Sequence, residues 1–263
     1  MAKNIGTLIS TAAAYQQRAT ESRLIESWTQ DSAAEFQTIA TRFLSEGKAL
    51  QGREETIRLN RDLSPSGKFN DTKVAVQGWF GSLGWIKNRI SALETKAGNN
   101  FGELYALPKS DANPVIQELR DQELRGEVRG LEPAERVRGY LIGCEQNDVE
   151  LLRALLQGPG LTPLVPSEVR VRGLDLRASR LDPSRHKAFI EIGELLDLLH
   201  AIARESEDLA KEFGVDISKI GLTADELGPK IREVLDFAVE HQSRGTRSHA
   251  ATLAEPVRQT VSA

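Results

Sequence analysis

The chain has 263 residues, of which 40% are apolar and 27% are charged, as in an ordinary folded protein. Its formal net charge of −4, with acidic and basic residues intermixed, argues against a wholly basic nucleic-acid-binding protein. A single cysteine excludes an internal disulfide framework and any multi-cysteine metal site, and no run of about 18 apolar residues is present to span a membrane.

The first part of the chain, residues 1–107, is predicted to consist of long coiled-coil-like helices. Residues 7–46 contain neither glycine nor proline, and one helix of that length would extend roughly 60 Å at about 1.5 Å per residue. Asp31 or Ser32 could cap a second helix, so one long helix and a hairpin of two helices both fit the pattern. The stretch from residue 36 to residue 57 carries an apolar stripe at steps of three, four and seven residues: Phe36, Ile39, Phe43, Leu50 and Ile57.

Residues 63–71, with the sequence LSPSGKFND, predict a turn, after which Asn70 or Asp71 caps the next helix. One face of that helix is apolar and keeps the three-four spacing of a packed seam: Val76, Trp79, Leu83, Ile86, Ile90, Leu93 and Ala97. The opposite face carries small or polar side chains: Gly81, Gly84, Asn88, Ser91 and Thr95. Because a glycine inside a helix costs about 1 kcal/mol relative to alanine, we expect a second helix to approach this small face closely.

The same helix holds two of the three tryptophans of the chain. Seams of this length are hard to cover within one chain, so we expect some of its side chains to contact other protein, a second copy included: Trp79, Leu83, Trp85, Ile86 and Ile90. Trp85 lies on neither face and is the aromatic residue expected to reach a partner. With a helix crossing on the small face, Gly84→Leu should cost more stability than Trp85→Ala.

A break at residues 105–114, YALPKSDANP, precedes a second region, residues 113–242, which is predicted to form a helical bundle. Asn113 supplies a cap and Pro114 occupies the first helical position, where its missing N–H costs nothing. Further helices are expected over 133–145, 148–157, from 183 to a stop at Gly214, and over 224–242. The remaining residues, 243–263, have no periodicity and are predicted to form a flexible tail.

Residues 168–177 have a different pattern, EVRVRGLDLR, in which apolar and charged side chains alternate around Gly173. Alternation of period two is typical of β-strands, so one small β-hairpin or an extended arm is predicted here. The predicted fold class is therefore all-α, with long N-terminal helices, a multi-helix bundle and at most this one small β element.

Candidate catalytic and metal-binding residues are sparse. Asp197 precedes His200 by three residues on a predicted helix, as in half of a di-iron bundle motif, but the second such pair is missing. Cys144 lies beside Tyr140 and Leu141 on an apolar face, which indicates a small core residue and not a nucleophile. No hydrolase, P-loop or zinc-protease motif is present. We therefore expect no enzymatic activity, no cofactor and no metal ion.

The strongest charge feature is a group of arginines interleaved with acidic residues: Arg170, Arg172, Arg177, Arg180 and Arg185. Spaced arginines of this kind bind phosphate groups or an acidic face of a protein partner. The alternative without a binding function is that these arginines are ordinary solvent-exposed residues that pair with nearby carboxylates. Nucleic-acid binding through this patch is the alternative function, and it is not favoured because no helix-turn-helix pattern accompanies the arginines.

The stretch from EPAER at residues 132–136, through NDVELLRALLQGPG at 147–160, to its proline-rich exit resembles uncharacterised helical proteins of tailed bacteriophages. The resemblance covers about 60 residues in the middle of the chain. It implies a role in the virion or in head assembly, and it implies no catalytic or ligand-binding residue.

Taken together, these features predict a non-catalytic, self-associating structural or assembly protein. Its expected partners are its own copies and other structural proteins, with no membrane. Because the N-terminus lacks an uninterrupted apolar leader segment, we expect the protein in the cytoplasm, or incorporated into a virion.

Overall fold

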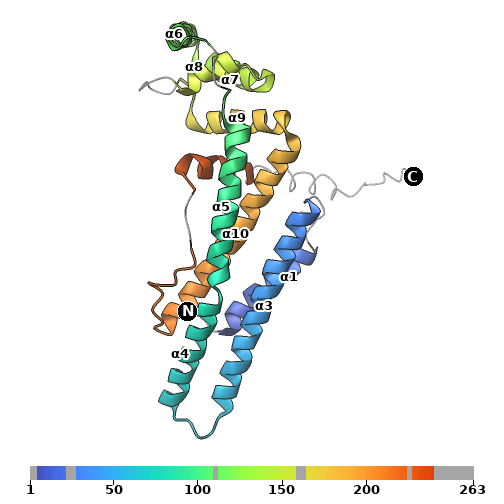
Figure 1. The fold of residues 1–263 in the computed structure, drawn as a ribbon, viewed down its shortest axis with the longest axis vertical. Helices are drawn as coiled ribbons and strands as arrows, with labels where there is room; N and C mark the ends of the chain where they lie inside the picture. The colour runs from blue at the N-terminus through green and yellow to red at the C-terminus, as the bar shows by residue number, and fades with distance from the viewer. Residues whose placement is uncertain (1–4, 22–27, 109–111, 158–163, 224–226, 240–263) are drawn as a thin grey trace, which may run out of the picture. The chain divides into compact units, whose positions relative to one another are not determined.

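The computed structural model describes residues 5–21, 28–108, 112–157, 164–223 and 227–239. These residues form helices, turns and loops and contain no strand, so the predicted all-α multi-helix fold is confirmed. No helix in this part of the chain combines the length and the apolar character that are needed to cross a lipid bilayer. The helices are α1 (Ile5–Glu21), α3 (Gln30–Leu59), α4 (Pro65–Ser82), α5 (Gly84–Tyr105), α6 (Pro114–Gly130), α7 (Pro133–Gln146), α8 (Val149–Gln157), α9 (Ser167–Leu181) and α10 (Pro183–Glu212) (Figure 1).

These helices are grouped into two compact units. The first unit combines Met1–Gly98 with Glu191–Leu227, and the second combines Asn99–Ile190 with Gly228–Ala263. A further helical stretch in the second unit covers residues 229–239. Helices α5 and α10 each contribute residues to both units.

This division differs from the predicted one, which separates the regions in chain order between residues 107 and 113. The second part of α10 returns to the first unit, where its apolar seam of Leu195, Leu199 and Ile202 is buried. The predicted tail, residues 243–263, lies outside the described residues.

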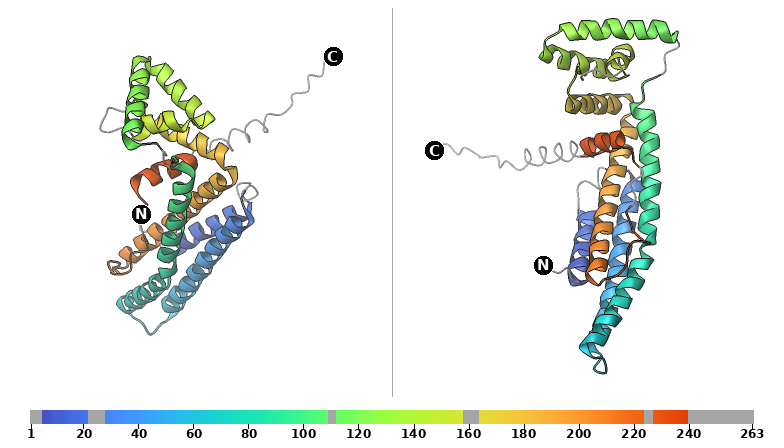
Figure 2. Two further views of the ribbon diagram at one scale, coloured as in Figure 1. Left: turned by 45° about the horizontal axis from the view of Figure 1, so that its top comes forward. Right: turned by 90° about the vertical axis from the view of Figure 1, so that its left-hand side faces the viewer.

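In the first unit, α1 packs against α3, and α3 packs against α4 (Figures 1 and 2). Of the two arrangements that the sequence leaves open, separate helices are the one observed. The cap of α3 is Thr29, whose hydroxyl oxygen accepts a hydrogen bond from the Ser32 N–H at 3.4 Å, so Asp31 lies in the first turn. Glu191 of α10 accepts hydrogen bonds from the N–H and the hydroxyl of Thr29, at 2.8 and 2.7 Å. These bonds tie the start of α3 to α10.

Helix α4 begins earlier than predicted. The hydroxyl oxygen of Ser64 accepts a hydrogen bond from the Gly67 N–H at 3.1 Å and caps the helix, with a proline in the first turn. Asn70 and Asp71, the predicted caps, therefore lie inside α4. The Ser-Pro pair starts a helix here, and the turn is confined to residues 60–64.

A single non-helical residue, Leu83, separates α4 from α5. The Leu83 N–H donates to the Phe80 carbonyl at 3.1 Å, and the Ile86 N–H donates to the Leu83 carbonyl at 2.8 Å, so backbone hydrogen bonds continue through the junction. The predicted apolar face also continues through it, and all its members are buried: Val76, Trp79, Leu83, Ile86, Ile90, Leu93 and Ala97. This seam is a large part of the core of the first unit.

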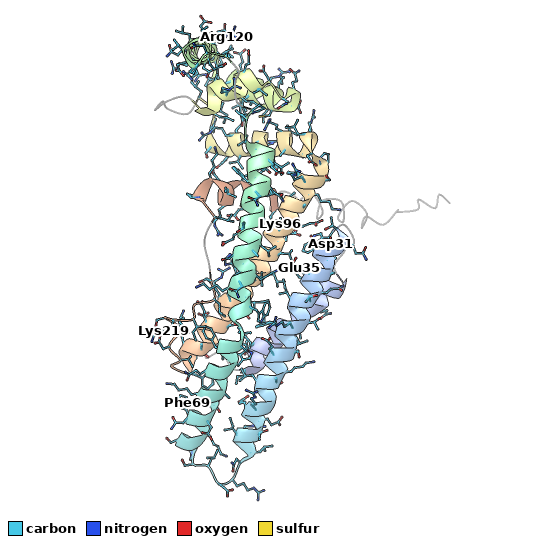
Figure 3. The ribbon with its side chains drawn as sticks, in the orientation of Figure 1. Asp31, Glu35, Phe69, Lys96, Arg120 and Lys219 are labelled. Carbon is cyan, nitrogen blue, oxygen red and sulfur yellow. The ribbon has the colours of Figure 1, made fainter. Side chains whose placement is uncertain are left out.

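The predicted stop of α10 at Gly214 is confirmed. Gly214 has a φ of 64°, a left-handed conformation that glycine adopts without steric cost. The Val215 N–H donates to the Ala210 carbonyl at 2.9 Å, which completes the terminal hydrogen-bond pattern of a Schellman motif. Beside this end, Phe213 stacks on Phe69 of α4 with 6.0 Å between ring centroids (Figure 3).

In the second unit, α6 packs against α8, and α7 packs against both α8 and α9. The predicted start of α6 is confirmed, because the side-chain oxygen of Asn113 accepts a hydrogen bond from the Val115 N–H at 2.9 Å. Helix α7 ends at Gln146 and is followed by its cap residue Asn147, which has a φ of 55°. Asp148 then accepts a hydrogen bond from a backbone N–H in the first turn of α8 at 3.1 Å.

The predicted β-hairpin at residues 168–177 is wrong, because this stretch lies within α9. Its alternating residues also fit a helical face, on which Val171, Leu174 and Ala178 are buried at steps of three and four. Gly173 lets α7 approach this helix, since a β-carbon there would lie 2.4 Å from Cε1 of Tyr140. Packing against α7 therefore supplies the stabilisation that two isolated strands would lack.

Candidate functional site

The predicted interaction residues of α4 and α5 do not form an exposed surface. Trp79, Leu83, Ile86 and Ile90 are buried, and Phe43 of α3 lies beside Trp79 with 6.5 Å between ring centroids. Their long apolar seam is covered by the helices of the same chain. In sequence, a core seam and an interface seam have the same spacing, so the pattern alone does not separate the two.

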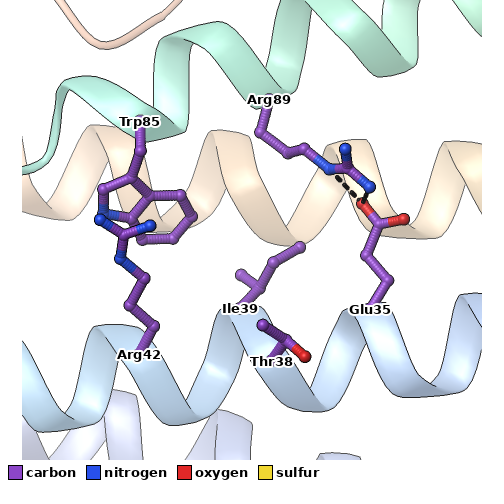
Figure 4. Close-up of a pocket in the computed structure, with 6 residues that line it drawn as sticks. All are labelled: Glu35, Thr38, Ile39, Arg42, Trp85 and Arg89. Carbon is purple, nitrogen blue, oxygen red and sulfur yellow. Dashed lines mark hydrogen bonds and ion pairs between the residues drawn. The ribbon is translucent and has the colours of Figure 1, made fainter.

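Trp85, the fifth of these residues, is half-buried in a shallow groove between α3 and α5 with a volume of about 310 Å³ (Figure 4). The guanidinium group of Arg42 lies 4.4 Å from the centre of its ring, and its indole N–H donates to Glu46 at 3.4 Å. One turn further along α5, Arg89 pairs with Glu35 of α3. Both cations of the groove thus already have partners in the same unit, and Trp85 is held by its own chain.

Among the residues that the structure describes, no second helix approaches the small face of α4 and α5 closely. A β-carbon built at Gly78, Gly81 or Gly84 would have no neighbouring atom within 4 Å. The prediction that the helix is buried on both sides is therefore wrong. Gly81 and Gly84 instead flank Leu83, where the helix is interrupted, and their low helix propensity favours a break at this point.

This geometry reverses the order of two mutational effects. We expect Trp85→Ala to lower the free energy of unfolding by about 1–2 kcal/mol, because it removes the ring contact with Arg42 and the hydrogen bond to Glu46. We expect Gly84→Leu to change it by less than about 0.5 kcal/mol, because the new side chain points into open space. Urea denaturation of both variants measures the difference. A larger loss of stability for Gly84→Leu than for Trp85→Ala would instead support the predicted close approach of a second helix to the small face.

The predicted arginines do not form one cationic surface. Arg177 is buried, and its Nε donates to Oδ1 of Asn147 at 2.7 Å while its Nη1 donates to the Leu104 carbonyl at 3.3 Å. Burial lowers the pKa of this guanidinium group. Arg177 thus links the end of α7 to the end of α5 within the second unit, which is a structural role.

Two more of these arginines pair with carboxylates on neighbouring helices. Arg180 lies 3.2 Å from Glu145 of α7, and Arg185 lies 2.7 Å from Glu103 of α5. All four side chains are exposed to solvent, so each pair contributes little to stability. The arrangement matches a basic rim that is paired with local acids.

The remaining two arginines are Arg170, which is half-buried, and Arg172, which is exposed. Arg172 lines a cavity of about 450 Å³ together with Asp175, His186 and Lys187. Nε2 of His186 lies 2.6 Å from Oδ1 of Asp175. Because cationic and anionic side chains both line this cavity, its electrostatics do not select a polyanion such as nucleic acid.

The predicted half di-iron motif, Asp197 and His200, lies in α10. Nε2 of His200 lies 4.0 Å from Oε1 of Glu94 on α5, in the first unit. In the described residues, no group of three or more His, Cys, Asp or Glu side chains is placed to hold a metal ion.

Cys144 is a buried core residue, as predicted, in a cluster with Tyr140, Leu152 and Val165. Burial raises the pKa of its thiol to about 11, whereas a thiol in an unfolded chain titrates near pH 8.5. The thiol has a higher pKa in the folded state than in the unfolded state, so burial of the neutral thiol favours folding. This contribution to stability is complete below about pH 8.5 and is lost as the pH rises through 11.

We therefore expect the free energy of unfolding to fall between about pH 9 and pH 11. Burial also raises the pKa of Tyr105 and Tyr140, whose contribution is lost only above about pH 10, where free tyrosine titrates. Cys144→Ala should remove the part of the loss of unfolding free energy that occurs below about pH 10. Urea titrations at closely spaced pH values test this, and equal slopes in the two proteins would contradict it.

Helix α6 shows the feature that the sequence does not reveal: it buries three polar side chains beside Val128 and exposes three large apolar ones. On the side toward α8, Gln117, Asp121 and Arg125 are only 8%, 5% and 5% exposed. The opposite side exposes three large apolar residues: Val115 at 68%, Ile116 at 51% and Leu119 at 55%. We call this exposed side, which also includes Gly126 and Gly130, the outer face of α6. An apolar stripe on a helix normally faces a core, so this stripe needs another partner.

Hydrogen bonds explain why the polar side turns inward. Nε2 of Gln117 donates to Oδ1 of Asp121 at 2.8 Å, within the helix. Nη2 of Arg125 donates to Glu118 at 2.6 Å, and its Nη1 donates to the Ala154 carbonyl of α8 at 3.4 Å. Since a buried charge costs several kcal/mol unless it is paired, the bonds within α6 offset the cost of burying these groups, and the bond to the Ala154 carbonyl links Arg125 to α8.

Comparison of the chain with protein-family models, with curated proteins and with solved structures finds no match in any of the three.

Proposed function

We propose that the protein is a non-catalytic assembly protein that binds other protein subunits, its own copies among them. The outer face of α6 is the observation that carries this proposal. Three large apolar side chains within five residues are exposed there, while hydrogen-bonded polar groups hold the opposite side of the helix inward. Covering exposed apolar surface contributes about 25 cal/mol per Å², so a protein partner at this face is favoured.

A component of a phage virion or of its head assembly is the form of this role that we propose first. Its support is the resemblance of the segment from EPAER at residues 132–136 to the proline-rich exit after residue 160. The rival function, nucleic-acid binding, has less support. Arg177 is buried, Arg180 and Arg185 pair with carboxylates, and the net charge is −4.

The mass of the native complexes tests the proposal. We expect native mass spectrometry and light scattering of the full chain, purified gently from producing cells, to show species heavier than one chain. We also expect no submicromolar, arginine-dependent binding of duplex DNA at low salt. A strict monomer with no co-purifying protein would contradict an assembly role, and tight DNA binding that Arg172→Ala weakens would favour the rival.

A further inference from the structure

We propose that the cavity beside Arg172 binds a small amphipathic carboxylate, a molecule with one carboxylate group and a short apolar chain. The inference goes beyond the proposed function, because it concerns a small-molecule ligand and not a protein partner. It follows from the size of the cavity, the apolar side chains in its wall and the way in which the charged groups around it are paired.

The cavity lies in the corner between α9 and the first turns of α10, and all its described lining residues belong to the second unit. Helix α9 ends at Leu181 and α10 begins at Pro183, so a single residue separates the two helices (Figure 1). The helical stretch 229–239 lines a third side. The volume of about 450 Å³ falls within the range of small-molecule sites, about 300–1,000 Å³.

Part of the cavity wall is apolar and comes from three helical segments. Leu176 of α9 is half-buried, and Ile190 of α10 is buried. Phe237, which is half-buried, and Ala238, which is buried, come from the last helical stretch. Such a wall favours a ligand with an apolar chain, because burying apolar surface of the ligand against it is favourable.

The two carboxylates that line the cavity already have partners in the chain. Oδ1 of Asp175 lies 2.6 Å from Nε2 of His186, and both side chains are mostly buried. Glu145 of α7 lies 3.2 Å from Arg180. Because these partners are in place, the carboxylates do not need a cationic ligand.

Arg172 is the group that we expect to hold the anionic end of the ligand. In the described part of the chain, no hydrogen bond or ion pair joins its guanidinium group to another residue. Lys187 also lines the cavity and adds positive charge. A guanidinium group binds a carboxylate through two parallel hydrogen bonds. Since Asp175 and Glu145 lie in the same cavity, a ligand with a single negative charge fits better than a phosphate, which carries more.

A titration with octanoate tests the site. Two-dimensional ¹H–¹⁵N NMR of the full chain should show saturable shifts of amide signals from α9, the first turns of α10 and residues 237–238. We expect a dissociation constant of about 0.1–1 mM, as for other ligands of this size. Octan-1-ol, which lacks the charge, and acetate, which lacks the chain, should each bind at least about tenfold more weakly. Octyl phosphate should bind no more tightly than octanoate.

Three variants locate the binding site. Arg172→Gln is expected to weaken octanoate binding at least about tenfold, to the level of octan-1-ol, because it removes the cation and keeps the apolar wall. Arg138→Gln is the matched control, since Arg138 is an exposed arginine of α7 that is not among the described lining residues. It should leave the affinity unchanged. Ser179→Phe should abolish binding, because the larger side chain occupies the cavity that Ser179 lines. Far-UV circular dichroism checks that all three variants are folded.

Four results would overturn the inference. They are the absence of saturable shifts up to about 10 mM octanoate, shifts confined to the exposed apolar side chains of α6, equal weakening by Arg172→Gln and Arg138→Gln, and tighter binding of octyl phosphate than of octanoate. If Ser179→Phe does not fold, Arg172→Gln still decides, because Arg172 is exposed. None of these results bears on the assembly role, which depends on the mass of the native complexes.

Discussion

Replacing Gly173 by alanine is expected to lower the free energy of unfolding by about 2 kcal/mol or more. The new β-carbon would lie 2.4 Å from Cε1 of Tyr140 and 2.8 Å from Sγ of Cys144, where α7 meets α9. Tyr140 cannot swing aside, because it is buried and its hydroxyl donates to the Arg170 carbonyl at 2.8 Å. Alanine also favours the helix by about 1 kcal/mol relative to glycine, which is less than the cost of this steric overlap. Chemical denaturation followed by circular dichroism measures the loss.

Two further variants make this result specific. Gly78→Ala, inside α4 and with no atom near its β-carbon, is expected to stabilise the protein by about 0.5–1 kcal/mol. Adding Tyr140→Leu to Gly173→Ala should cost less than the sum of the two single changes, since the smaller side chain relieves the clash. If Gly173→Ala is as stable as the wild type, the close approach of α7 and α9 is wrong.

Ile90→Ala is expected to cost about 2–5 kcal/mol of folding stability, the usual range for removing a large side chain from a well-packed core. Ile90 is fully buried in the seam that runs through α4 and α5. Thermal and urea unfolding measure the effect. Val74→Ala, on the exposed side of α4, serves as the control and should change the stability by less than about 0.5 kcal/mol.

The same experiment decides between a core seam and an interface seam. If Ile90 lay in an interface between copies, as the sequence predicts, Ile90→Ala would weaken self-association and leave the unfolding of the isolated chain nearly unchanged. The structure leads us to expect the reverse, namely a large loss of stability, because Ile90 is fully buried within one chain.

The sequence was most informative where the chemistry of one residue controls the backbone. Asn113 before a proline and Gly214 after an apolar seam mark helix ends in sequence, and both are helix ends in the structure. The apolar face from Val76 to Ala97 was also predicted, because its period matches that of a helix. The caps of α3 and α4 lie earlier in the chain than predicted, because Thr and Ser side chains cap a helix as well as those of Asp31 and Asn70 do.

Features that depend on what a helix packs against were not predictable from local pattern. The alternation in residues 168–177 fits a strand as well as a helix until α7 is placed against Gly173. The outer face of α6 has the sequence of a core-facing stripe, and only the paired Gln117, Asp121 and Arg125 on the opposite side show that it turns outward. These side chains pair at spacings of four and seven residues within α6, as exposed polar groups on a helix also do, so the spacing does not reveal that they are buried.

The division of the chain into two units has a spectroscopic consequence. Trp28, Trp79 and Trp85 are the only tryptophans of the chain, and all three belong to the first unit. Intrinsic fluorescence excited at the red edge of tryptophan absorption therefore reports on that unit alone, whereas far-UV ellipticity averages over the helices of both. Overlaying the two unfolding transitions shows whether the halves melt together, because a single cooperative transition requires every probe to give the same curve.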